Sequence, residues 1–386
     1  MRSLFELAGY EYKKMFLRKG TIIALALGLL ITCFVQIMFL LPLFTADETP
    51  WQNMAYAREH SRSISGTPID GDLISRAWVY SETIDGSRYD NVRWITQSII
   101  SMSEAQSVAE ANTFYELHHS LVQSSTNWLL DINRISERGA EWIMTQHESI
   151  DTPWVYEYFG GYYNFFTRLS IVVVVLFFAL AVSIAPVFAT EHSTGVAQIM
   201  LASKFGKSKL IWAKLLTAAT FSAGITFVFL LCSYGINMAV FGADGGAAAF
   251  QLFWPPSPYN FNMAQVSVIY ILNAASRAIF FGAAVLLLSA KLKSSFSTII
   301  FASVWVFLAS ALVVALPIRW LFDLYRLIVE MLPVMVIPAM STFSIAPYEI
   351  FGFMFPPFVF EAVFSLVVGA AMLIFAGRVF KRYQVG

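Results

Sequence analysis

The chain has 386 residues, of which 58% are hydrophobic and 13% are charged, and its 25 basic side chains balance its 25 acidic ones. Soluble domains carry about 25% charged and about 45–50% apolar residues, so this composition excludes intrinsic disorder and favours a protein whose main solvent is lipid. A pI near 7.0 argues against a basic nucleic-acid binder. Both cysteines lie in apolar runs, which excludes a disulfide scaffold.

A helix needs about 20 mostly apolar residues to cross the hydrocarbon core of a bilayer. Six segments meet this requirement, which predicts an all-α membrane protein with six transmembrane helices. The predicted spans are 21–44, 169–189, 210–241, 264–289, 296–316 and 358–375. The first is too long for the apolar part of a signal peptide and no small-residue cleavage motif follows it, so we expect an uncleaved anchor.

Lysine placement predicts the orientation. All ten lysines fall in four short segments, 13–19, 204–214, 291–293 and position 381. With six spans these segments share one side, which the positive-inside rule makes cytoplasmic, together with both termini. The formal charges of the inside segments sum to +11 and those of the outside segments to −12. The remaining positive charge is Arg277, inside the fourth span. Lys214, in the first turns of the third span, is expected to extend towards the interface.

Two amphipathic regions flank the first span. Residues 1–20 place apolar side chains among basic ones, as in a helix lying on the inner leaflet. The segment 45–167 has no lysine or cysteine and shows helical periodicity, which predicts a mainly helical extracytoplasmic domain. Within it, Trp128, Ile132, Ile135 and Trp142 repeat at the spacing of a packed seam, and an aromatic cluster over 154–166 is typical of a membrane interface.

The histidines of this domain suggest a metal site at first sight. His118 and His119 are adjacent, and His147 precedes Glu148. Adjacent histidines cannot share a helix face, and the spacing is not HExxH. We therefore interpret them as surface or packing histidines and predict no metal site and no catalytic residue in the chain.

The loop 190–209 after the second span carries the most distinctive pattern. Gly206-Lys207-Ser208 resembles the end of a phosphate loop, but the first glycine of that motif would have to stand at position 201, which is leucine, so no nucleotide site is predicted in this chain. Residues 195–203 predict a short amphipathic helix. Its apolar side holds Val196, Ile199 and Met200, and Glu191, Ser193 and Thr194 suit its N-terminal end.

Two interpretations of this helix stay open from the residues alone. A short, rigid, partly apolar helix at the cytoplasmic face is suited to docking on a partner protein. It is equally suited to resting on anionic lipid, with help from Lys204, Lys207 and Lys209.

The pattern of this loop resembles that of the permease subunit of type-2 ABC exporters. It consists of an acidic residue shortly after a span, a glycine four residues later, a Leu-Ala-Ser step and a lysine at the next span. These are Glu191, Gly195, residues 201–203 and Lys214, and residues 1–20 resemble the elbow helix of that family. Lys204 and Phe205 stand where many members have a proline. The six spans, the cytoplasmic termini and the long first outer segment also match.

The resemblance implies that two permease copies, or this chain and a related one, pair with two cytosolic ATPase subunits, which bind the ATP and magnesium. This chain then needs no cofactor of its own and moves an amphiphilic substrate outward across the plasma membrane. The helix around 195–203 would be the coupling helix seated on the ATPase. The implied coupling residues are Glu191, Gly195, Val196, Ile199, Met200, Lys204, Lys207 and Lys214.

One charge lies deep in the predicted membrane. Arg277 is near the middle of the fourth span, where a charge costs at least about 2.5–3.5 kcal/mol on insertion scales unless it faces protein or water. Glu361, near the outer start of the last span, is its expected partner. The pair serves either a substrate path or the joining of two spans. Between these spans, prolines interrupt 317–356, which predicts two short re-entrant helices.

Three other classes of function remain as alternatives. A membrane-embedded enzyme needs convergent acid, base or metal ligands, and the predicted spans offer only Arg277 and Glu361. A sensor or assembly protein would use the outer domain to bind a ligand, but about ten residues follow the last span, too few for an output domain. A secondary transporter usually shows carboxylates at the membrane midplane.

Overall fold

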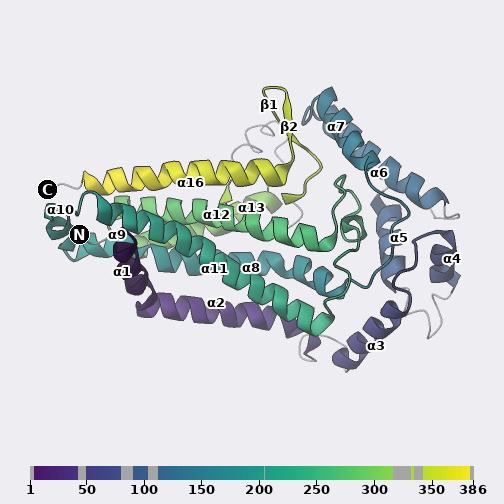
Figure 1. Cartoon of the computed structure of the whole chain (residues 1–386), viewed down its shortest axis with the longest axis horizontal. Coiled ribbons are helices and arrows are strands. Elements are labelled where there is room, and N and C mark those ends of the chain that lie inside the picture. The colour runs from purple at the N-terminus through teal and green to yellow at the C-terminus, as the bar shows by residue number, and fades with distance from the viewer. Residues whose placement is uncertain are drawn as a thin grey trace.

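The fold was analysed in a computed structural model, which describes residues 4–41, 49–79, 90–102, 112–203, 205–315, 332–333 and 342–382. Long helices run side by side along the long axis of an elongated molecule, and the helices α3 to α7 gather at one end (Figure 1). The short helices α9 and α10 lie at the other end, beside α1. The candidate functional site lies at this second end.

In chain order the elements are α1 (Leu4–Phe16), α2 (Lys19–Ile37), the 3-10 turn η1 (Met38–Leu40), α3 (Pro50–Ser63), α4 (Gly71–Val79), α5 (Asp90–Met102), α6 (Asn112–Asp131), α7 (Glu137–Glu148), α8 (Gly160–Ile184), α9 (Pro186–Ser193), α10 (Val196–Ala202), α11 (Lys209–Phe241), η4 (Phe250–Leu252), α12 (Met263–Leu292), α13 (Ser295–Ala315), β1 (Tyr348–Ile350), β2 (Phe353–Phe355) and α16 (Pro357–Lys381).

Five stretches of helix are long and apolar enough to cross a membrane, which supports a multi-pass membrane protein. They are Lys19–Leu40, Gly160–Ser193, Lys209–Phe241, Met263–Leu292 and Pro357–Lys381, and they cover five of the six predicted spans. The helix α13 occupies the place of the remaining one, with a shorter apolar stretch over Ser295–Phe307. A sixth span and the orientation of the bundle therefore stay predictions.

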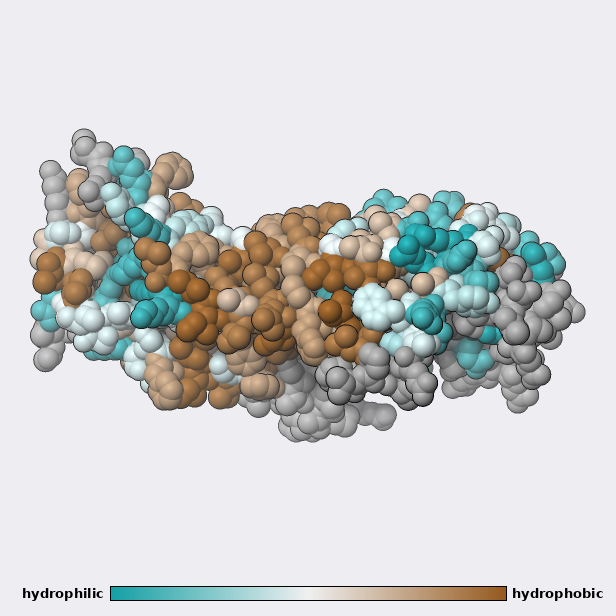
Figure 2. Space-filling view, turned by 90° about the horizontal axis from the view of Figure 1, so that it is seen from below, coloured by the Kyte–Doolittle hydropathy of each residue, from teal (hydrophilic) through white to brown (hydrophobic). Residues whose placement is uncertain are grey.

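The bundle has a buried centre and an apolar exterior. Most side chains of α8 and α12 are buried, whereas α2 and α16 expose apolar residues such as Leu30 and Val367. Figure 2 shows the result on one face, a broad apolar band between polar ends. Apolar side chains that face outward around a helical bundle are what lipid contact requires, because lipid offers no penalty for their exposure.

The segment predicted as a mainly helical outer domain contains α3 to α7, whose core includes Ile95, Ile99 and Phe114. The predicted seam over 128–142 is wrong as one continuous helix face. Asn133 adopts a positive φ of 55° between α6 and α7, and the Ser136 side chain caps the new helix by accepting from the Gly139 amide. Trp128 is exposed, whereas Ile132, Ile135 and Trp142 are partly buried against a small core that includes Leu129 and Ile143.

The chain before the last span contains a β-hairpin that the periodicity did not predict. Strands β1 and β2 pair antiparallel, and Phe351 and Gly352 both have positive φ, as a tight two-residue hairpin turn requires. The hairpin presents Phe351 almost fully to its surroundings. At the end of the segment 317–356 the structure has this hairpin where helix was predicted. The re-entrant helices predicted over the rest of the segment lie largely outside the described residues.

Close approach of α11 and α12 depends on one glycine. A Cβ added at Gly282 would lie 2.2 Å from the Ser222 Oγ and 3.0 Å from the Ile184 Cδ1. Gly282→Ala is expected to destabilise the fold by about 1–3 kcal/mol through overpacking, measured as a lower thermal unfolding midpoint in one detergent. Gly224→Ala on α11 is the control, because nothing lies within 4 Å of its Cβ. Equal midpoints for the two variants would contradict this packing.

Candidate functional site at the α9–α10 end of the bundle

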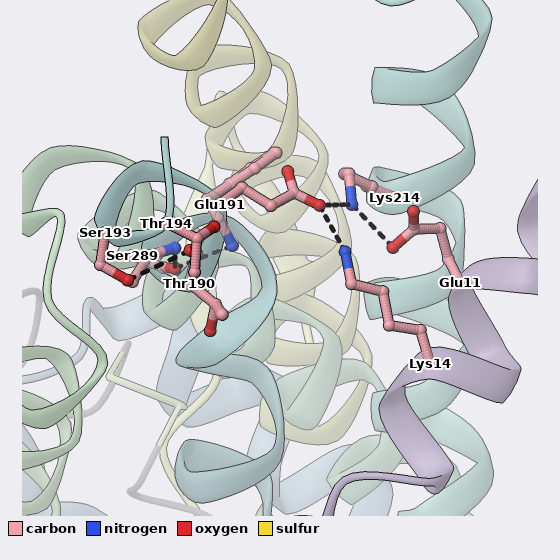
Figure 3. A network of polar contacts seen from close by, with 10 residues as sticks. Glu11, Lys14, Thr190, Glu191, Ser193, Thr194, Lys214 and Ser289 are labelled. Carbon is pink, nitrogen blue, oxygen red and sulfur yellow. Dashed lines mark hydrogen bonds and ion pairs between the residues drawn. The ribbon is translucent and has the colours of Figure 1, made fainter. Parts of the chain in front are cut away.

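The loop after the second predicted span forms a helix, a tight turn and a second short helix. Pro186 begins α9, and Gly195 follows its end with a φ of 72°, a left-handed conformation that suits glycine. The predicted helix over 195–203 is present as α10. The predicted capping of this helix by Ser193 and Thr194 is absent, and Gly195 is the N-cap residue. The Ser193 and Thr194 hydroxyls instead donate back to the Thr190 carbonyl at 3.1 and 2.7 Å (Figure 3).

Glu191 points away from α10 and into an ion-pair network with three other helical residues (Figure 3). Its Oε1 accepts from the Lys214 Nζ at 2.6 Å and from the Lys14 Nζ at 2.6 Å. The same Lys214 ammonium donates to Glu11 Oε2 at 2.7 Å. The network thus joins α1, α9 and α11 through side chains far apart in the sequence.

The centre of the network is buried, so its charges depend on one another, whereas the Lys14 side chain at its edge is 40% exposed. Lys214 is 1% exposed and Glu191 is 2% exposed, which corrects the expectation that Lys214 extends to the interface. Two lysines and two glutamates balance in charge, and Arg18 lies close enough for Glu11 and Glu191 to oppose the lowering of its pKa by burial. Because Lys214 is the cation in contact with Glu11, its loss leaves the buried Glu11 carboxylate without this partner.

The short helix α10 has one inner and one outer side. Ala197 and Leu201 are buried against the bundle, whereas Val196 is exposed and Ile199 is 75% exposed. Met200 is half-buried beside them. The outer side therefore presents an apolar surface at the end of the molecule.

The turn that leads from α10 into α11 packs closely on its end. A Cβ at Gly206 would lie 1.6 Å from the Met200 carbonyl oxygen, so this position admits only glycine without a shift of the backbone. Lys207 is exposed on the turn, and the Lys209 ammonium lies 5.2 Å from the Phe205 ring centroid. Lys204 lies outside the described residues.

The intramembrane charges expected to pair are in contact. The Arg277 guanidinium on α12 forms an ion pair with the Glu361 carboxylate on α16, and both side chains are buried. Arg277 also donates to Asn273 Oδ1 at 3.0 Å and to the Leu332 carbonyl at 3.1 Å. Tyr348 of the hairpin donates to the other oxygen of Glu361 at 3.5 Å. The site therefore joins two spans and the segment between them, and its role in a path or in packing stays a prediction.

Sequence reasoning missed three residues that the structure places in polar clusters. Glu11 and Lys14 were treated as parts of an amphipathic surface, although their three-residue spacing on one helix face could have indicated a paired contact. Arg168 stands one position before the predicted second span, whose apolar run begins at Leu169. It is in fact buried within α8.

Three histidines of the outer domain, His118, His119 and His147, meet in a packed cluster. The His147 ring centroid lies 5.1 Å from that of His118 and 5.2 Å from that of His119. His118 donates to the Pro255 carbonyl at 2.8 Å and packs edge-on against Trp154. Among the described residues, no group of three or more His, Cys, Asp or Glu side chains could hold a metal ion.

Acidification is expected to loosen this cluster. Burial lowers the pKa of His118 to about 4 and that of His147 to about 4, below the ordinary value of about 6.5. The unfolded domain therefore binds protons more readily than the folded one, and stability falls as pH drops from about 6.5 towards 4. Hydrogen exchange of α6 and α7 at stepped pH measures this. The double variant His118→Gln, His147→Gln should flatten the pH dependence, whereas His60→Gln on α3 should retain it.

Comparison with protein-family models, with curated proteins and with solved structures finds no match, so the functional argument rests on the residues of this chain.

Proposed function

We propose that the chain is the membrane-spanning permease subunit of an ATP-driven exporter of the type-2 ABC class. The observation that carries the proposal is the buried ion pair between Glu191 and Lys214. These are the two charged residues of the sequence pattern that resembles this family, and they lie 23 positions apart. Their contact fixes the end of α9, and with it the turn into α10, to the first part of α11.

Such a connection suits the transmission of movement. A displacement of α10 would act on α11 through Glu191 and Lys214, and on α1 through Lys14 and Glu11. Charge-assisted hydrogen bonds are short and directional, so a displacement of one partner moves the other. The elbow-like helix α1 and the span α11 would then move together when α10 is pushed.

The exposed surface of α10 favours a protein partner over lipid. Val196 and Ile199 lie on a helix at the very end of the bundle (Figure 1). An exposed apolar patch followed in the next turn by an exposed lysine, Lys207, is typical of an interface whose centre excludes water. A cytosolic ATPase subunit that binds ATP and magnesium is the proposed partner, so this chain supplies neither a catalytic residue nor a cofactor site.

The rest of the proposal follows from that role. Two permease copies, or this chain and a related one, would form the path through the plasma membrane, and closure of the ATPase pair would open it outward. The apolar exterior of the bundle and the polar outer domain suit an amphiphilic substrate, such as a lipid, glycolipid, peptide or hydrophobic drug.

Co-purification tests this function. The tagged chain is isolated from its native membrane in mild detergent, and co-eluting proteins are identified by sequence for a phosphate loop. Wild type should retain an ATPase chain, and Ile199→Asp should lose most of it, because a charge at the centre of an apolar contact is desolvated without a partner. Phe351→Asp is the matched control, an exposed aromatic at the other end of the molecule. Absence of any ATPase from the wild-type eluate, or equal retention by Ile199→Asp, would contradict the proposal.

A further inference from the structure

A second buried arginine lies at the opposite end of the bundle from Lys214. Arg168 on α8 is 7% exposed. Its Nη1 donates to Asn237 Oδ1 on α11 at 3.2 Å, and Asn237 in turn donates to Gln36 Oε1 on α2 at 2.7 Å. These residues lie in the last turns of α2 and α11 and the early turns of α8. The three side chains therefore form a polar row across three helices at the end near α3 to α7.

Aromatic rings enclose the guanidinium. Its central carbon lies 4.8 Å from the Phe241 ring centroid and 5.5 Å from the Phe39 ring centroid. These contacts attract a cation through the electron-rich ring faces. The two ring contacts stabilise the cation less than a carboxylate would, and they leave guanidinium N–H groups available as hydrogen-bond donors.

Arg168 has no anionic partner in the part of the chain that the structure describes. Its guanidinium contacts one neutral amide oxygen and two aromatic rings. Arg277, buried near the middle of α12, has a carboxylate, an amide oxygen and a backbone carbonyl. A buried cation without a counter-charge is costly in a membrane protein, so the site calls for an anion from outside the chain.

The surroundings indicate which anion fits. A planar guanidinium fork matches the two oxygens of a phosphate. Phe39 is 50% exposed beside the site, and Phe34 on the same helix is also exposed, so the polar row borders the apolar surface that would face lipid. A phosphate carried at the head of an acyl chain could reach Arg168 along α2, with its chains against that surface.

We propose that Arg168, with Asn237 and Gln36, forms a binding site for the phosphate of an anionic phospholipid at this end of α2, α8 and α11. The lipid headgroup supplies the missing negative charge, and its acyl chains continue along the exposed face of α2. The site is independent of the exporter function, because it requires only that the bundle is embedded in lipid.

Thermal unfolding in a neutral detergent tests the site. Dioleoyl phosphatidylglycerol, dioleoyl phosphatidylcholine or inorganic phosphate is titrated at equal phosphate concentration. Wild type should be stabilised most by phosphatidylglycerol, and Arg168→Gln should bind it at least about tenfold more weakly, since a charge-assisted pair is lost. Arg62→Gln is the control, because Arg62 already pairs with Asp244 on the surface. An equal response of wild type and Arg168→Gln, or saturation by inorganic phosphate alone, would overturn the proposal.

A second variant keeps the test decisive if Arg168→Gln does not fold. Asn237→Asp places a carboxylate where the guanidinium already donates, at the 3.2 Å contact. It should abolish the response to phosphatidylglycerol, because the internal charge replaces the headgroup. An undiminished response to phosphatidylglycerol in Asn237→Asp would contradict a headgroup bound at Arg168.

Discussion

Replacing Lys214 with methionine is expected to lower the free energy of unfolding by about 3–5 kcal/mol, the cost of leaving buried charges without their partner. Among the residues that the structure describes, Lys214 alone bonds both Glu11 and Glu191, at 2.7 and 2.6 Å. Its loss leaves two buried carboxylates with Lys14 on one of them. The measurement is the thermal unfolding midpoint of the purified chain, together with hydrogen exchange of α1.

The matched control is Lys207→Met, which removes an exposed lysine from the preceding turn and should change the midpoint little. The triple variant Glu11→Gln, Glu191→Gln, Lys214→Met removes every charge that depends on Lys214 and should recover most of the lost stability. Equal midpoints for Lys214→Met and Lys207→Met, or no recovery in the triple variant, would show that these charges are not interdependent.

Arg277→Met is the other substitution with a large expected effect, again about 3–5 kcal/mol, because it leaves the Glu361 carboxylate buried between α12 and α16. The Leu332 carbonyl and the Asn273 side chain lose a donor as well. The unfolding midpoint in detergent measures the loss, with Arg62→Met as an exposed arginine control.

The double variant Arg277→Met, Glu361→Gln separates packing from transport. Without either charge the two helices should regain most of their stability. If the pair only joins the spans, the double variant also retains the ATPase activity of the copurified complex. If the pair lines a path, stability recovers and substrate-stimulated ATPase activity does not. No recovery of stability in the double variant would contradict the interdependence of these two charges.

Hydropathy and residue type predicted the parts of the fold that depend on burial along one helix. Apolar runs located the five membrane-crossing helices to within a few residues at most ends, since lipid exposure demands an apolar surface over a fixed length. The exception is α8, which begins at Gly160 rather than Leu169. Aromatic residues such as Tyr162 continue the helix beyond the apolar run, and periodicity cannot mark where the lipid ends.

Contacts between distant segments were harder to predict. The pairing of Arg277 with Glu361 was accessible because a deep charge needs a partner and few candidates exist. The burial of Lys214 could not be predicted, because a lysine near a helix end can lie either at the membrane interface or inside the bundle. Only the approach of α1 to α11, over more than 200 residues of sequence, provides Glu11 as its partner.

Local backbone geometry was also beyond a pattern of apolar spacing. The positive φ of Asn133 interrupts a seam that the spacing of Trp128 and Ile132 made continuous. The hairpin turn at Phe351 and Gly352 places an aromatic residue in a left-handed conformation, which few sequences signal. In both places a residue with positive φ changes the direction of the chain, and the spacing of apolar residues does not reveal it.

Site-directed cross-linking tests whether α10 contacts an ATPase. Ile199→Cys is made in a chain whose two native cysteines, Cys33 and Cys232, are replaced by alanine, labelled with a benzophenone maleimide and irradiated in native membranes. Phe351→Cys is the control from the opposite end. The proposal predicts an adduct between position 199 and a protein whose peptides include a phosphate loop, and none from position 351. Adducts from position 199 with lipid alone would contradict an exporter permease that couples through α10.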